Sequence, residues 1–206
     1  GALTIDDPFV CLPPTGTGAI SATPDGNAVV PDGFSTIYVL SKGASQTIVQ
    51  TNATPDFVVT VADDYTIHTL IYVADSNSEN YLDLNQITFG TTTISDLNAL
   101  IEQGGGTVCG ALDLTGATVT VDACDAQIGD FVWEDMNGDG IQNEGGTTGI
   151  PNVTVTLTGT APDGEVINRV ETTDANGAYL FENLPPGNYN INFGTPANFT
   201  GTYPNE

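Results

Sequence analysis

The sequence predicts an all-β protein made of two tandem β-sandwich domains, with one short helix in the first. Short runs of apolar and β-branched residues, many of them alternating with polar ones, recur along the 206-residue chain and are typical of strands. Pro-Asp-Gly tripeptides at 24–26 and 31–33 favour tight turns between such runs. A break near Cys124 divides the chain into two predicted domains, 1–124 and 127–206.

The first segment shows strand patterns with one helical interruption. Lys42 and Gly43 mark a hairpin, and Tyr65, at the start of the longest run, suits the tyrosine corner of an immunoglobulin-like sandwich. Between 94 and 103, apolar residues fall on one helical face, Thr93 can cap the start and Gly104 stops the pattern. We expect this helix to cover one end of the sandwich. The expected strands are 19–22, 36–40, 47–50, 57–61, 65–73 and 117–121.

The second segment has its own alternating patterns. Val153, Val155 and Leu157 alternate on one strand, and Tyr179 and Phe181 do so on another. Residues 174–177, Asp-Ala-Asn-Gly, favour a tight structural turn between strands. These patterns predict a second sandwich with its own core.

Residues 135–144, Asp-Met-Asn-Gly-Asp-Gly-Ile-Gln-Asn-Glu, carry the pattern of a calcium loop. Oxygen-bearing side chains stand at Asp135, Asn137 and Asp139, and calcium takes about six to eight oxygen ligands. Gly140 permits the sharp turn that lets the carbonyl of Ile141 point inward. The alternative interpretation is a solvated Asn-Gly and Asp-Gly turn.

The closing position of such a loop departs from the usual pattern. A helical calcium hand has a bidentate glutamate at its twelfth position, where this chain has Gly146. The nearest acid is Glu144, which we expect to replace it. The predicted metal site is therefore a calcium site formed by Asp135, Asn137, Asp139, Ile141 and Glu144.

Charge excludes several classes of partner. The chain has 26 acidic and 2 basic residues, Lys42 and Arg169, and its net charge of −24 excludes nucleic acid, which is bound through lysine and arginine. Anionic membrane surfaces are disfavoured for the same reason, and no apolar stretch of about 18 residues predicts membrane insertion. Mutual repulsion of the carboxylates favours bound salt or divalent cations.

The residues capable of catalysis are sparse. His68, the single histidine, lies in a strand pattern with no evident acidic partner, so no serine or cysteine nucleophile can be matched to a base. The three cysteines contain no Cys-x-x-Cys spacing, which excludes a zinc ribbon or a thioredoxin-like motif. They indicate an exported protein with a disulfide. We expect no enzymatic activity.

Four motifs of the second segment occur together in order: 128–135, 149–157, 173–181 and 184–189. With them, the segment resembles the B-type repeat of serine-aspartate-repeat surface adhesins. The resemblance implies a Greek-key β-sandwich that serves as a calcium-rigidified stalk module on bacterial surfaces. It also implies Asp135, Asn137, Asp139 and the Ile141 carbonyl as ligands, with an acid usual where this chain has Gly146 and Glu144 as its expected substitute. Because a further strand follows in that family, we expect the domain to be truncated at its C-terminus.

The first segment resembles repeats of very large secreted proteins of the Bacteroidetes group, through residues 20–27 and 64–70. Such repeats tend to have four cysteines, whereas this chain has Cys11, Cys109 and Cys124. The resemblance therefore implies one thiol that is unpaired or paired outside the chain. We expect Cys11 to be bridged to Cys109 or to Cys124.

Together these features predict a structural extracellular protein: a calcium-stabilised segment of a bacterial surface stalk, adhesin or filament. The alternative is a carbohydrate- or protein-binding module, with Phe34, Tyr81 and Phe89 as candidate loop aromatics. Expected partners are further copies or tandem domains. In a head-to-tail contact, the stretch Leu3–Ile5 would be free to pair with the second domain of the next copy.

Overall fold

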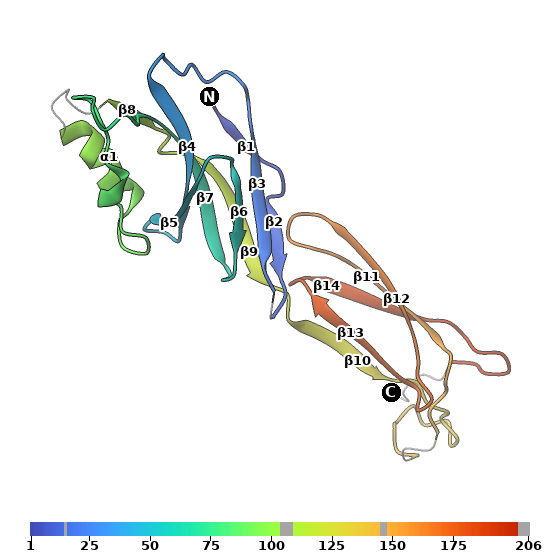
Figure 1. The fold of residues 1–206 in the computed structure, drawn as a ribbon. Helices are drawn as coiled ribbons and strands as arrows, with labels where there is room; N and C mark the ends of the chain where they lie inside the picture. Colours follow the sequence, from blue (N-terminus) through green and yellow to red (C-terminus); the bar gives the residue numbers. More distant parts are fainter. Residues whose placement is uncertain (15, 104–108, 145–147, 202–206) are drawn as a thin grey trace. The chain divides into compact units, whose positions relative to one another are not determined.

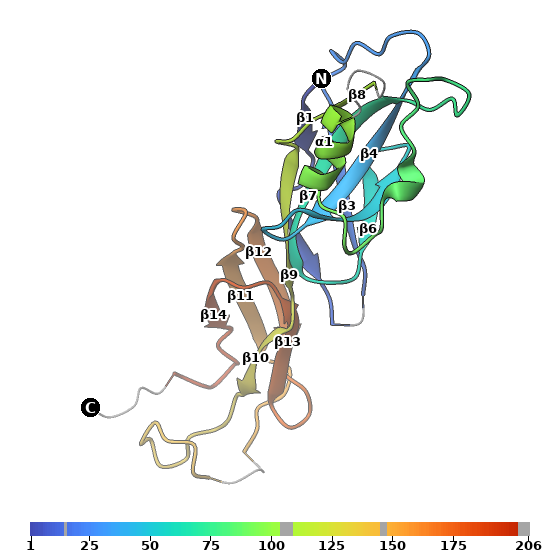
Figure 2. The ribbon, with the colours of Figure 1, turned by 90° about the vertical axis from the view of Figure 1, so that its left-hand side faces the viewer.

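The computed structural model describes residues 1–14, 16–103, 109–144 and 148–201, which fold mainly as β-strands (Figures 1 and 2). The chain divides into two compact units, Gly1–Ala123 and Cys124–Glu206, called here the first and second units. The described residues confirm the all-β prediction, with α1 (Ile94–Gln103) as their α-helix and η1 (Leu84–Gln86) as a short 3-10 turn.

The first unit contains two sheets. One has six strands in the order β2-β9-β7-β4-β5, with β8 also paired to β7. The other has the order β1-β3-β6. The strands of the larger sheet are β2 (Phe9–Leu12), β4 (Phe34–Lys42), β5 (Thr47–Asn52), β7 (Asp63–Val73), β8 (Gly110–Leu112) and β9 (Ala117–Ala123). Those of the smaller sheet are β1 (Leu3–Ile5), β3 (Gly18–Pro24) and β6 (Asp56–Val59).

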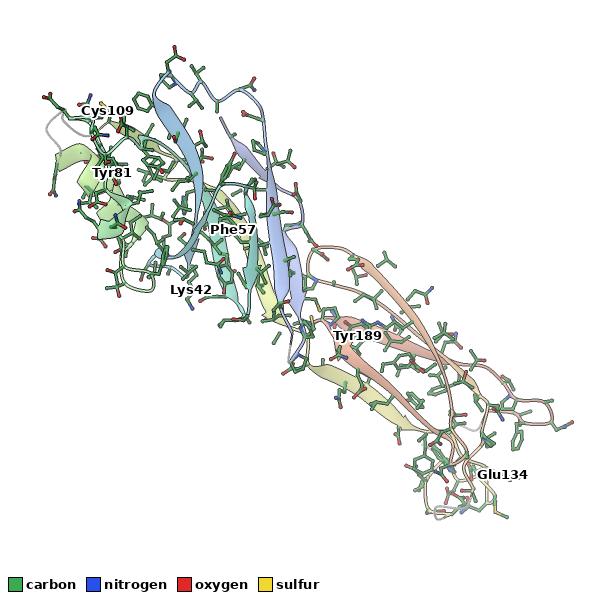
Figure 3. All side chains as sticks on the ribbon, viewed as in Figure 1. Lys42, Phe57, Tyr81, Cys109, Glu134 and Tyr189 are labelled. Atoms are coloured by element: carbon green, nitrogen blue, oxygen red, sulfur yellow. The ribbon has the colours of Figure 1, made fainter. Side chains whose placement is uncertain are left out.

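Apolar side chains cover both faces of the larger sheet. On β4, the neighbours Val39 and Leu40 are both fully buried, and because successive strand residues point to opposite faces, they belong to different clusters. Leu40 packs in a cluster with Ile20 and Phe57 of the smaller sheet, so the two sheets form a sandwich. The side chain of Phe57 in β6 is labelled on the ribbon in Figure 3.

The helix packs against the other face of the larger sheet. Ile94 and Leu97 are buried in one cluster with Val39, Ile48 and Leu70. The expectation that the helix covers an end of the sandwich was therefore wrong. It covers a face, because the apolar residues there need a partner of their own.

The predicted start of the helix is confirmed by a capping box. The Thr93 hydroxyl oxygen accepts from the backbone N–H of Asp96 at 3.1 Å, and the Asp96 carboxylate accepts from the Thr93 N–H at 2.9 Å. Gly104, expected to end the helix, lies outside the described residues.

The second unit contains a two-stranded and a three-stranded sheet. In the first, β10 (Ala126–Phe131) pairs with β13 (Ala178–Leu184). In the second, β11 (Thr154–Thr160) lies between β12 (Val166–Thr172) and β14 (Asn188–Phe193). Side chains from both sheets are buried together, including Val155, Leu157, Ile167, Phe181 and Leu184.

A tyrosine hydroxyl stabilises a corner in each unit. The hydroxyl of Tyr65, near the start of β7, donates to the carbonyl of Val61 at 2.9 Å. The hydroxyl of Tyr189, near the start of β14, donates to the carbonyl of Pro185 at 2.6 Å. Both bonds span four residues, and they hold the chain where it enters a strand.

Two expectations concern contacts outside the chain and the end of the second unit. Leu3–Ile5, expected to be available to a neighbouring copy, pairs antiparallel with β3 and forms an edge strand of the smaller sheet, so only one side of it is paired within that sheet. The predicted truncation concerns the end of the chain, where residues 202–206 lie outside the described residues.

Strand register selects one of the two expected disulfide pairings. Strand β2 runs parallel to β9 and places Cys11 opposite Asp122, two positions before Cys124. Cys11 and Cys124 are disulfide-bonded and Cys109 is a free thiol. Because the chain has three cysteines, the bond joins Cys11 to Cys124.

His68 is a buried core residue. Both His68 and its partner Ser41 have 0% exposure, and the ring Nε2 lies 2.8 Å from the Ser41 hydroxyl oxygen. The ring Nδ1 lies 2.8 Å from the carbonyl oxygen of Asp113, which can only accept, so Nδ1 carries the proton and Nε2 accepts from Ser41. Burial lowers the pKa of His68.

Removing either tyrosine hydroxyl should destabilise the unit that contains it. We expect Tyr65→Phe and Tyr189→Phe each to lower the free energy of unfolding by about 0.5–1.5 kcal/mol, since each loses one hydrogen bond. Urea unfolding measures this change. Tyr38→Phe is the control, because the Tyr38 hydroxyl has no hydrogen bond among the described residues; an equal loss in all three variants would contradict the assignment.

Acid should destabilise the first unit through His68. Because the pKa is lowered in the folded state, the unfolded chain binds more protons; the stabilisation is present above the unfolded pKa of about 6.5 and is lost as pH falls below it. The loss should reach up to about 1.4 kcal/mol per pH unit.

The comparison is between the wild type and His68→Gln, unfolded in urea at pH 7.5 and pH 5.5. The aspartates and glutamates are the same in both proteins and should contribute equally to the loss of stability on acidification. The wild type should lose more, because it alone has the histidine. Equal losses would show that His68 does not titrate on unfolding in this range.

Candidate metal centre

The predicted calcium loop is held closed at its base by backbone hydrogen bonds. Trp133 and Gly149 form an isolated antiparallel bridge just beyond β10. The N–H of Glu134 donates to the carbonyl of Thr148 at 2.8 Å, and the N–H of Ile150 donates to the carbonyl of Val132 at 2.8 Å. The chain therefore leaves and returns at one point, and the loop 134–148 is anchored to the end of a strand.

A second turn packs tightly against this base. The N–H of Val132 donates to the carbonyl of Gly177 at 2.8 Å, where Gly177 has a φ of +84°. A side chain at Gly149 would overlap the carbonyl oxygen of Asn176. In this turn the Asp174 carboxylate accepts from the N–H groups of Ala178 and Asn176, and these bonds lower its pKa. The turn is structural, as its sequence predicts.

Within the loop, carboxylates curl the backbone around themselves. Asp135 accepts from the N–H of Gly138 at 2.7 Å and from the N–H of Gly140 at 2.9 Å. Both glycines have positive φ, +73° and +72°, which other residues rarely adopt. Asp139 accepts from the N–H of Ile141 at 2.8 Å. Gly140 therefore permits a sharp turn of the backbone, as the sequence predicts.

The structure brings three of the predicted ligands together. Carboxylate oxygens of Asp135, Asp139 and Glu144 all lie within 4.8 Å of one another. Calcium–oxygen distances are about 2.3–2.6 Å, so oxygens at this spacing can surround one ion. The Glu144 Oε1 atom is buried and has no hydrogen-bond partner among the described residues. An all-oxygen donor set with one unsatisfied carboxylate oxygen fits a hard divalent cation.

The other two predicted ligands lie in the same loop but bond to protein donors. The Asn137 Oδ1 accepts from the N–H of Asp139 at 2.9 Å, and its amide NH₂ donates to the Asp139 carboxylate at 2.9 Å. The carbonyl of Ile141 accepts from the N–H of Asn143 at 2.9 Å. Each of these oxygens keeps a second lone pair. Gly146, the usual closing position, lies outside the described residues.

Sequence reasoning missed Asn143. Its side-chain amide donates to the Asp139 carboxylate at 3.0 Å, on the same oxygen that Asn137 contacts. The signal was present in the spacing, because 143 continues the alternation of 135, 137, 139 and 141. An asparagine there supplies an oxygen as well as a donor.

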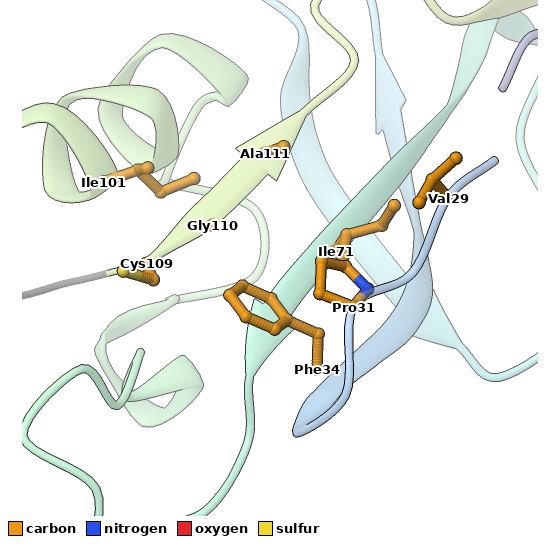
Figure 4. A pocket seen from close by; sticks show the side chains of 8 residues that line it. All are labelled: Val29, Pro31, Phe34, Ile71, Ile101, Cys109, Gly110 and Ala111. Carbon is orange, nitrogen blue, oxygen red and sulfur yellow. The ribbon is translucent and has the colours of Figure 1, made fainter.

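The loop aromatics proposed for a ligand site in the first unit do not stack with one another. The recorded ring contacts of the described residues involve none of Phe34, Tyr81 and Phe89. Phe34 instead begins β4 and lines an apolar pocket with the free Cys109, Ile71 and Ile101 (Figure 4).

The second unit is similar to known proteins. Residues 126–206 match a family model described as SdrD B-like domain. Two proteins of Staphylococcus aureus, a bone sialoprotein-binding protein (strain MRSA252) and a serine-aspartate repeat-containing protein E (strain MSSA476), are each 49% identical over 78 residues. The match covers 38% of this chain and 6% of each relative. The predicted resemblance to the B-type repeat is confirmed for these residues.

A solved structure described as a tetra-tandem repeat in the extending region of a large adhesion protein is 12% identical to this chain. The comparison covers 94% of this chain and 48% of that one, with a TM-score of 0.21. This value is too low to establish a common fold.

Filling the space at the base of the loop should destabilise the second unit. Gly149→Ala would push the Trp133–Gly149 bridge away from Asn176, and we expect a loss of about 1–3 kcal/mol in unfolding free energy. Gly201→Ala is the matched control, because no atom of the described residues lies within 4 Å of its added Cβ. Similar urea midpoints for the two variants would show that the base of the loop tolerates displacement.

Proposed function

We propose that this chain is a structural segment of a bacterial surface stalk, adhesin or filament, and that calcium stabilises its second unit. The main observation that supports this proposal is the cluster of the Asp135, Asp139 and Glu144 carboxylates in a loop anchored to β10. The match of the second unit to the SdrD B-like domain supports a surface role.

Electrostatics explain why an ion would stabilise this loop. Three carboxylates within 4.8 Å of one another repel, and neither Asp139 nor Glu144 is paired with a lysine or arginine among the described residues. Asp135, Asp139 and Glu144 would hold calcium, with further oxygens available from Asn137, Ile141 and Asn143. A divalent cation would supply the missing positive charge and crosslink both halves of the loop. Since the unfolded chain lacks this arrangement, binding would favour the folded unit.

An extracellular location is part of the proposal. The disulfide between Cys11 and Cys124 is typical of oxidising compartments. None of the helices in the described ranges has the length and apolar character that a membrane crossing requires.

A structural role agrees better with the burial of the first unit than catalysis does. Ser41 and His68 form a serine–histidine pair, but both are fully buried and no substrate can reach them. The pair contributes a satisfied hydrogen bond to the core. The matched relatives carry the names of a repeat-containing protein and of a binding protein.

A second candidate function is a binding module, and one observation favours it. The second unit has a pocket of about 470 Å³ whose lining includes Phe131, Trp133, Phe193 and Phe199. Ligand pockets typically have such volumes and aromatic linings. A module of this kind can serve within a stalk, so the two functions are compatible.

Calcium should raise the stability of the second unit. At a calcium concentration a hundredfold above the dissociation constant, the expected gain is about 2.7 kcal/mol. Thermal unfolding in calcium and in excess chelator, followed by fluorescence of the single tryptophan, Trp133, reports on the second unit.

Asp139→Ala should abolish the difference between calcium and chelator, because it removes one of the three clustered carboxylates. Glu171→Ala, which removes an exposed acid of β12, is the charge-matched control and should retain the difference. Superimposable melting curves of the wild type with and without calcium would show that the loop is only a turn.

A further inference from the structure

The aromatic pocket of the second unit lies beside the metal loop. It is lined by residues 131–135, which lead into the loop, by Ile150, and by Phe193 at the end of β14 with residues 194–196 and 198–201 after it. Its volume is about 470 Å³. Four aromatic rings line it: Phe131, Trp133, Phe193 and Phe199. The pocket thus joins two segments that lie about sixty residues apart in the chain.

Two of the rings offer exposed surface to a ligand. Phe193 is 46% exposed and Phe199 is 37% exposed. Tyr179 supports Phe193 with an edge contact at a centroid distance of 5.6 Å, and Phe131 contacts Trp133 in the same way at 6.0 Å. Ring faces carry negative electrostatic potential, which attracts cations.

The charged groups of the pocket are both negative. Glu134 and Asp135 line it, and no lysine, arginine or histidine does. Asp135 is engaged with the N–H groups of the loop. The Glu134 side chain is exposed and has no hydrogen bond or ion pair among the described residues, so its carboxylate can bind a ligand (Figure 3). In a chain of net charge −24, an anionic ligand is strongly disfavoured here.

The chain's own basic residues are already engaged elsewhere. Lys42, in the first unit, lies 3.6 Å from the Asp63 carboxylate. Arg169 donates to the carbonyls of Glu182 at 2.8 Å and Asn183 at 3.3 Å. These are the only lysine and arginine in the sequence. A cation that fills the pocket must therefore come from another molecule.

We propose that this pocket binds an arginine side chain of a protein partner. A guanidinium group is planar, so it can stack on an exposed ring while it pairs with a carboxylate through two N–H donors. The residues that line the pocket offer both kinds of group, since Phe193 and Phe199 carry rings and the exposed Glu134 carries a carboxylate. The inference deepens the binding function proposed above and does not require calcium.

The test uses a capped serine-rich peptide with one central arginine, titrated into the whole chain in the presence of chelator. Trp133 is the only tryptophan, so its indole N–H gives a single NMR signal from a residue that lines the pocket. We expect a saturable shift of this signal. A peptide with citrulline in place of arginine is the matched probe, because citrulline keeps the shape and loses the charge; it should bind at least about fivefold more weakly.

Paired variants separate the pocket from general attraction to an acidic protein. Glu134→Gln should weaken arginine binding at least about fivefold, as should Phe199→Ala. Glu171→Gln removes one exposed carboxylate of β12 and should change the affinity less than twofold. Thermal unfolding of each variant verifies that the second unit remains folded.

Three outcomes would overturn the inference. Equal weakening by Glu134→Gln and Glu171→Gln would show non-specific attraction, and equal binding of the citrulline peptide would show a neutral ligand, such as a glycan. Absence of any shift at Trp133 would exclude the pocket. The titration contains chelator, so it tests arginine binding separately from calcium binding. If calcium stabilises the protein but the arginine peptide does not bind, this inference fails and the proposed calcium site stands.

Discussion

An excess of carboxylates with almost no basic side chains is the constraint on which this structure depends. With 26 acidic and 2 basic residues, ion pairs cannot satisfy the carboxylates. Backbone N–H groups and hydroxyls do so instead. The Asp6 carboxylate accepts from the hydroxyls of Ser21 and Thr23, which lowers its pKa, and Asp96 caps the helix through Thr93. Acidic residues therefore define turns and caps, where donors are free.

In the predicted calcium loop, protein donors satisfy the carboxylates only in part. Asp135 is satisfied by two glycine N–H groups, but Glu144 keeps a buried oxygen without a partner among the described residues. Two asparagine amides converge on Asp139 and partly offset the repulsion there. Protein donors among the described residues do not satisfy the whole cluster, and this observation supports the proposed calcium site. The neighbouring pocket shows the same lack of positive charge: Glu134 lines it, and no lysine, arginine or histidine does.

The cores of the two units follow a different rule, in which every buried face needs a covering layer. In the first unit, Val39 and Leu40 point to opposite faces of β4, so the helix and the smaller sheet are both required. In the second unit, two smaller sheets cover one another around Phe181 and Leu157. The tyrosine corners at Tyr65 and Tyr189 recur because both sandwiches must return the chain to a strand at a sharp angle.

The sequence by itself determined the features that depend on near neighbours. Alternation placed strands such as β4, β7 and β11, and the spacing of Asp135, Asn137 and Asp139 located the loop, since turns, caps and curled loops are governed by residues a few positions apart. The four motifs of the second segment predicted its resemblance to the B-type repeat, and residues 126–206 match the SdrD B-like domain model.

Only the tertiary structure decided what depends on register and long-range packing. The parallel register of β2 and β9 selected Cys11–Cys124 over Cys11–Cys109, and pairing with β3 placed Leu3–Ile5 at the edge of the smaller sheet. The aromatic pocket was invisible in the sequence, because Trp133 and Phe199 become neighbours of one cavity only when β10 and β14 are placed in their sheets. Local patterns indicate which face of a strand or helix carries a residue. Which other element packs against that face depends on the packing of the whole core.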